Sequence, residues 1–147
     1  MHLPTLIWRH RKENLKKCTL TPLEGRAGFS FYTYPHNPLP SLQGYILLQI
    51  GAPPLTEQDK DFGLLLIDGT WRYAKIMEKT LPILPARSLY GFTTAYLRRQ
   101  FDCPSPSCGL ASIEAIFLAY HILKRKTDGL LDLYYRKEHF LTLNGLL

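Results

Sequence analysis

The chain has 147 residues, of which 46% are hydrophobic and 20% charged, and its net charge is +6. This balance excludes a disordered chain and predicts one compact globular domain with a hydrophobic core. The longest apolar runs, residues 44–50 and 63–67, are too short to cross a bilayer, and the first residues lack the pattern of a signal peptide, so we expect a soluble cytoplasmic protein with no membrane partner.

The first half of the chain carries the pattern of a parallel sheet. Residues 3–8 predict a first strand, a basic loop runs to residue 19, and residues 29–34 predict a second strand. The runs at 44–50 and 63–67 are continuously apolar, which is typical of strands buried on both faces of a parallel sheet. Between them, Thr56 and Asp59 predict the capping box of a short helical turn.

The strand at 63–67 ends in Asp68-Gly69-Thr70, and a helical pattern follows at once over residues 71–77. The carboxyl end of such a strand is where open α/β sheets bind ligands, and the start of the helix offers unpaired N–H groups to an anion. Trp71 and Ala74 share one face of this helix and, with Asp68, would line a pocket. The alternative is that Trp71 belongs to the core and Asp68 helps to cap the helix.

The second half is different in character. Residues 88–92 predict a short strand, residues 111–124 are apolar almost all round and predict a buried helix, and residues 128–143 predict a last helical region. We therefore expect an α/β part over residues 1–92 and a mostly helical part over residues 93–147.

The excess of positive charge favours a polyanionic partner such as RNA, because phosphate contacts release counterions. The alternative is that each basic cluster is a solvated loop or helix end. The cysteines, Cys18, Cys103 and Cys108, are odd in number, which argues against disulfides. Cys103 and Cys108 have no second ligand pair, so we expect no metal.

Five motifs, in order between residues 16 and 144, resemble those of the Tsr3/DTW superfamily of RNA aminocarboxypropyltransferases. They are Lys16-Lys17-Cys18-Thr19, Asp68-Gly69-Thr70-Trp71, Leu81-Pro82-Ile83-Leu84, Leu110-Ala111-Ser112-Ile113-Glu114-Ala115 and Phe140-Leu141-Thr142-Leu143-Asn144. The chain departs from the family pattern in a shortened stretch at residues 86–91 and at Ala111, where the family has Ser. These departures leave the choice between ribosomal and transfer RNA open.

The resemblance implies a SPOUT-like knotted fold, with a parallel sheet in the N-terminal half and a mostly helical C-terminal half, that holds S-adenosylmethionine. It implies cofactor contacts from Thr19 at the amino-acid end, Leu65 and Leu84 around the nucleoside, Trp71 and Ala74 around the methyl group, and Asp68 near the reacting centre. Ala111 and Ser112 are further expected cofactor contacts.

Transfer of the 3-amino-3-carboxypropyl group to a ring nitrogen of a uridine-type base is the implied activity. Asp68 would be the catalytic residue, accepting or orienting the proton of that nitrogen. Glu114 is open between a structural and a catalytic role. The residues expected to contact RNA phosphates are Arg9, Arg11, Lys12, Lys16, Lys17, Arg98 and Arg99. Two other functions stay open, an RNA methyltransferase of the SPOUT type and a non-catalytic RNA-binding module.

Overall fold

The computed structural model describes residues 2–12, 19–89, 91–95 and 110–146, apart from the side chain of Trp71. Within these residues the strands form one five-stranded sheet, all parallel, in the order β2-β1-β4-β3-β5. The strands are β1 (Thr5–His10), β2 (Phe29–Tyr34), β3 (Tyr45–Leu48), β4 (Gly63–Asp68) and β5 (Ala86–Arg87). The predicted α/β class is therefore confirmed.

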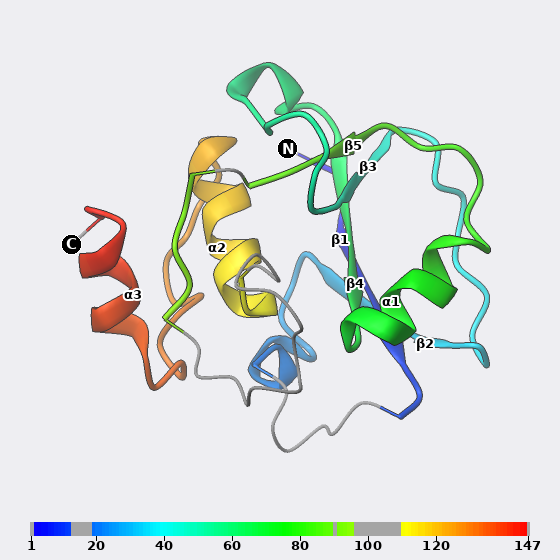
Figure 1. The fold of residues 1–147 in the computed structure, drawn as a ribbon, viewed down its shortest axis with the longest axis horizontal. Coiled ribbons are helices and arrows are strands. Elements are labelled where there is room, and N and C mark those ends of the chain that lie inside the picture. The colour runs from blue at the N-terminus through cyan, green and yellow to red at the C-terminus, as the bar shows by residue number, and fades with distance from the viewer. Residues whose placement is uncertain (1, 13–18, 90, 96–109, 147) are drawn as a thin grey trace.

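The helices are α1 (Trp71–Glu78), α2 (Ser112–Ile122) and α3 (Lys137–Leu143), with short 3-10 turns η1 (Thr21–Leu23) and η2 (Glu57–Asp59). In Figure 1, α1 lies on one side of the sheet and α2 and α3 lie on the other. Parallel strands require crossover connections, and these connections place the helices on the faces of the sheet.

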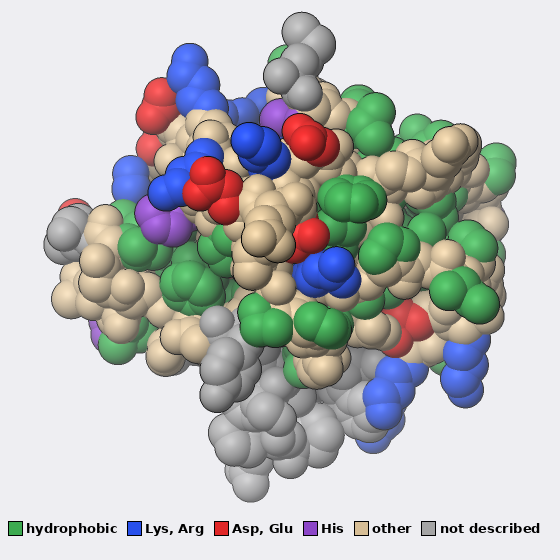
Figure 2. All heavy atoms as spheres, turned by 90° about the horizontal axis from the view of Figure 1, so that it is seen from above, with side chains coloured by type: hydrophobic (Ala, Val, Ile, Leu, Met, Phe, Trp, Pro, Cys, Tyr) green, Lys and Arg blue, Asp and Glu red, His purple; other side chains and the backbone are tan. Residues whose placement is uncertain are grey.

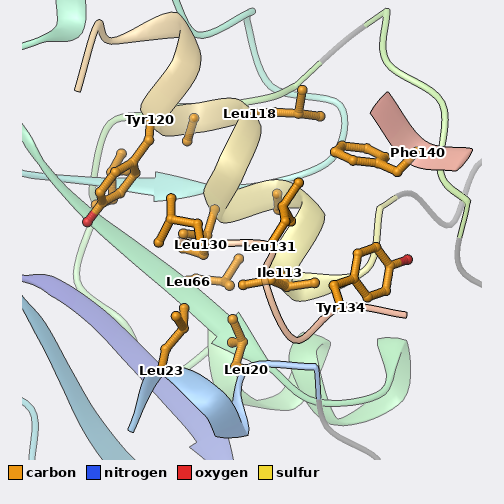
Figure 3. Close-up of a cluster of buried hydrophobic side chains, with 14 of the residues drawn as sticks. Leu20, Leu23, Leu66, Ile113, Leu118, Tyr120, Leu130, Leu131, Tyr134 and Phe140 are labelled. Atoms are coloured by element: carbon orange, nitrogen blue, oxygen red, sulfur yellow. The ribbon is translucent and has the colours of Figure 1, made fainter. Parts of the chain in front are cut away.

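The sheet separates two apolar clusters. Because successive side chains of a strand point to opposite faces, Leu64 and Leu66 of β4 join the cluster beneath α2, whereas Leu65 joins the cluster beneath α1. Figure 3 shows the α2 side, where Leu20 and Leu66 point toward Ile113 of α2. This larger cluster draws on both halves of the chain, so the described residues share one continuous core beneath α2.

Several element boundaries differ from the sequence prediction. The first strand runs over Thr5–His10 instead of residues 3–8, so Arg9 and His10 belong to the strand and not to the basic loop. The predicted strand at 88–92 is wrong, because β5 covers only Ala86–Arg87 and is followed by a single bridge between Pro54 and Ser88. In the predicted helical region at 128–143, a helix forms only from Lys137 onward.

Helix α1 begins at Trp71 as predicted, with Thr70 at its N-cap position. The Thr70 side chain makes no capping hydrogen bond, while its carbonyl accepts from the Ala74 N–H at 2.8 Å. The capping box at η2 is confirmed, since Thr56 Oγ1 accepts from Gln58 N at 3.3 Å and Asp59 Oδ2 accepts from Thr56 N at 3.1 Å.

Buried Glu114 ties α2 to two other segments. Its carboxylate accepts from Ala111 N at 2.8 Å, Thr94 Oγ1 at 2.5 Å, Ala95 N at 2.8 Å and Tyr134 Oη at 2.9 Å. Four neutral donors thus satisfy both oxygens of a side chain that has no exposed surface. This arrangement supports the structural role of Glu114 that the sequence left open.

Figure 2 views the molecule from the top of Figure 1, where β1 begins. On this face Lys and Arg side chains lie among Asp and Glu side chains, so charges of both signs are mixed there. None of the helices in the described part of the chain is long and apolar enough to cross a bilayer.

Candidate active site

Two polar side chains meet at the carboxyl edge of the sheet. Arg9 lies near the end of β1 and Asp68 ends β4, and the parallel pairing of these strands places the two residues side by side in register. Arg9 Nε donates to Asp68 Oδ2 at 3.1 Å. Both residues are buried, at 6% and 4% exposure, so this is a desolvated ion pair that constrains both side chains.

Arg9 also pairs with the carboxylate of Glu24, just after η1, and its guanidinium lies 4.9 Å from the centre of the Phe31 ring. We expected Arg9 in an exposed basic loop, and the structure corrects this placement. The strand continues through Arg9 and turns its side chain inward, toward carboxylates from two other segments. One guanidinium thus lies against two carboxylates, those of Glu24 and Asp68.

The start of α2 completes the arrangement. Ser112 Oγ donates to Asp68 Oδ1 at 3.0 Å, and Thr19 Oγ1 accepts from the backbone N–H of Ile113 at 3.1 Å. Thr19 therefore supplies the helix N-terminus with the capping oxygen that Ala111, at the N-cap position, lacks. The fold thus gathers Thr19, Ser112 and Asp68, which come from three separate sequence motifs.

The structure places three other predicted cofactor contacts, Leu65, Ala74 and Leu84, on the α1 side of the sheet. Leu65 is fully buried in the cluster beneath α1, and half-buried Leu84 packs against the same cluster. Half-buried Ala74 lies on α1, three residues before buried Met77 of that cluster. Leu65 and Leu84 are thus brought together, but the sheet separates the Leu65 side chain from Asp68.

No motif of the sequence indicates a role for His10. Its side chain lies beside the carboxyl edge of the sheet. Its ring stacks on the ring of Tyr73 in α1 with centroids 3.9 Å apart, and its centroid lies 5.5 Å from that of the Tyr34 ring. His10 Nδ1 accepts a hydrogen bond from the Lys12 N–H at 3.1 Å. Burial lowers the pKa of His10, and the charges of Arg11 and Lys12 lower it further. No sequence spacing marks this residue, because its two aromatic partners, Tyr34 and Tyr73, come from two different elements.

We expect His10 to make stability depend on pH. The unfolded chain binds a proton near pH 6.5, whereas the folded chain binds it only at lower pH, so the free energy of unfolding should fall as the pH drops below about 6.5. His10→Phe keeps an aromatic ring beside Tyr73 and should flatten this decline in urea titrations. His139→Phe, at an exposed site on α3, is the control and should leave the wild-type curve in place. An equal decline in His10→Phe would contradict the assignment.

The predicted RNA contacts are described only in part. Arg11 and Lys12 are exposed just beyond the carboxyl end of β1. Lys16, Lys17, Arg98 and Arg99 lie outside the described residues, as do the side chain of Trp71 and all three cysteines. Among the residues that the structure does describe, no group of His, Cys, Asp and Glu side chains could hold a metal ion.

The fold is similar to a solved enzyme structure. The chain superimposes on the SAM-dependent rRNA:acp-transferase Tsr3 from Vulcanisaeta distributa with a TM-score of 0.73 and 23% identity, over 99% of this chain and 80% of that one. The sequence matches no protein-family model and no curated protein. The structural likeness establishes that the two chains share a fold.

Proposed function

We propose that the protein transfers the 3-amino-3-carboxypropyl group of S-adenosylmethionine to a uridine-type base of RNA, with ribosomal RNA as the substrate class. The observation that carries the proposal is the meeting of Asp68, Ser112 and Thr19 at the carboxyl edge of the sheet. Open α/β sheets bind their ligands at this edge, and the chain shares its fold with an rRNA aminocarboxypropyltransferase.

The chemistry of these residues fits S-adenosylmethionine. The hydroxyls of Thr19 and Ser112 suit the ammonium and carboxylate of its amino-acid end, beside the backbone of Ala111. The carboxylates of Asp68 and Glu24 favour a sulfonium cation nearby. When bound, the cofactor supplies an arm whose C–S bond breaks, with its electron pair leaving on sulfur, as a new bond to the base forms.

The proposal also includes cofactor contacts on the α1 side of the sheet. Leu84 and Ala74, both half-buried on the α1 side, would bound the nucleoside and the methyl group together with Trp71. Leu65 would contribute by packing the strand that ends in Asp68. The proposal includes the knotted SPOUT arrangement, which the shared fold supports.

Asp68 is the proposed catalytic residue. Asp68 Oδ2 accepts a hydrogen bond from Arg9 Nε and Asp68 Oδ1 accepts one from Ser112 Oγ, and an ionised carboxylate can take up a proton. It would therefore accept or orient the proton that the ring nitrogen loses as that nitrogen forms its bond to carbon. Arg9 and Ser112 hold the carboxylate in place, which is the positioning that such a proton transfer needs.

Phosphate contacts are assigned to exposed Arg11 and Lys12 and, beyond the described residues, to Lys16, Lys17, Arg98 and Arg99. Arg9 is removed from this set, because its buried side chain is bound to two carboxylates.

Doubly labelled S-adenosylmethionine tests the activity. Carbon label in the carboxypropyl arm should appear on ribosomal RNA, and label in the methyl group should stay off it. Methyl label on the RNA would instead identify a methyltransferase. A folded protein that binds RNA but gains no thermal stability from millimolar S-adenosylmethionine would be a non-catalytic RNA-binding module, since a ligand that binds only the native state must stabilise it.

We expect Trp71→Ala to weaken S-adenosylmethionine binding by about 1–3 kcal/mol, because it removes an apolar wall and an aromatic contact to the cation. Calorimetric titration of the folded variant measures this change. Wild-type affinity would assign Trp71 to the core instead.

A further inference from the structure

A hollow of about 460 Å³ opens beside Arg9, and none of the proposed cofactor contacts lines it. Its walls come from β1, β2 and the turn after η1, and they include Arg9, Arg11, Glu24, Phe29 and Phe31. This volume lies within the range of about 300–1,000 Å³ that is usual for small-molecule sites. The hollow therefore has room for a flat heterocycle and part of its sugar.

Side chains alternate between the two faces of the sheet along β2, and those on one face give the hollow its aromatic wall. Phe29 and Phe31 are two apart, so both rings point to the α2 side of the sheet. Phe29 stacks on Tyr120 with centroids 5.7 Å apart and ring planes within 9°, which fixes its orientation. Both Phe rings remain only partly buried, so apolar surface faces the hollow.

Charged groups surround this apolar wall. Exposed Arg11 supplies a cation, and Glu24 holds a carboxylate whose side chain is 45% exposed. Nucleobases stack on aromatic rings, phosphates pair with exposed cations, and a carboxylate accepts from the N–H groups of a base edge. The hollow combines all three kinds of contact.

Arg9 connects this hollow to the proposed reacting centre. The same guanidinium that lines the hollow donates to Asp68 Oδ2 at 3.1 Å. A base seated against Arg9 would thus be separated from Asp68 by a single side chain. The hollow lies on the same face of the sheet as Asp68, and Leu65 lies on the other.

We propose that this hollow receives the nucleobase next to the target base in a single-stranded RNA segment. The base stacks against the partly exposed ring of Phe31, Glu24 accepts from its N–H edge, and Arg11 contacts the adjoining phosphate. This inference rests on the proposed function, and it adds the acceptor side of the same site.

Photocrosslinking tests the location directly. A short single-stranded RNA with one 4-thiouridine is irradiated with the wild-type protein, and the crosslinked peptide is identified by mass spectrometry, beside a thermal-shift measurement with S-adenosylmethionine. We expect crosslinks within residues 29–33 and stabilisation by the cofactor. Crosslinks confined to other segments would overturn the proposal that RNA binds in this hollow, even if the cofactor binds. Crosslinks at 29–33 without cofactor binding would support the hollow and overturn the transferase function.

A variant pair measures the contribution of the aromatic wall. Phe31→Ala should weaken binding of this RNA about 5- to 150-fold, as expected for the loss of one base–aromatic stack, and leave the thermal shift with S-adenosylmethionine unchanged. Tyr32→Ala is the matched control, because its ring leaves the same strand toward the opposite face. Equal RNA affinity in Phe31→Ala and wild type would overturn the proposal.

Discussion

Replacing Asp68 by Asn is expected to lower the single-turnover rate of arm transfer about 10²–10⁴-fold, the range usual for general-base assistance. The substitution suits the local geometry. The amide oxygen can still accept from Arg9 Nε, and the amide nitrogen can donate to Ser112 Oγ, so the shape of the site is kept while charge and basicity are lost.

Rate and cofactor affinity measured on the same variant separate the roles of Asp68. A rate loss that persists at saturating S-adenosylmethionine identifies a function in the reacting step, whereas a loss that saturating cofactor restores identifies a function in binding. Normal activity together with a loss of about 1 kcal/mol in the free energy of unfolding would mean that Asp68 has a purely structural role. Asp61→Asn, exposed just before the same strand, is the matched control and should behave as wild type.

Glu114→Ala is expected to lower the free energy of unfolding by more than about 3 kcal/mol. The change removes the acceptor for the N–H groups of Ala95 and Ala111 and for the Tyr134 hydroxyl. Each buried donor left without a partner costs about 1–3 kcal/mol, and the deleted side chain adds a cavity.

Urea denaturation at neutral pH measures this loss. Glu138→Ala removes an exposed carboxylate from α3 and should change stability by no more than about 0.5 kcal/mol. If Glu114→Ala were as stable as this control, the carboxylate would not be the link between α2 and residues 94–95. A stable Glu114→Ala that had lost transfer activity would instead favour the catalytic role.

Some parts of the fold could be predicted because their signal is local. The continuous apolar runs led to β3 and β4, the apolar residues around α2 predicted its burial, and Thr56 with Asp59 marked η2. The strand predicted at residues 88–92 does not form in the described part of that stretch, where β5 ends at Arg87 and a single bridge joins Ser88 to Pro54. The local sequence pattern indicates which secondary structure a segment can form, whereas the segments that pair with it decide where that element ends.

The sequence by itself determined that Asp68 ends a buried strand and precedes a helix, because apolar periodicity and its interruption are properties of neighbouring residues. Only the tertiary structure decided what Asp68 touches. Arg9 precedes it by 59 residues and Ser112 follows it by 44, and they meet because β1 pairs with β4 and α2 packs on the same face of the sheet. Strand order is a long-range property, so no local spacing could turn Arg9 from an expected surface cation into the buried partner of this carboxylate.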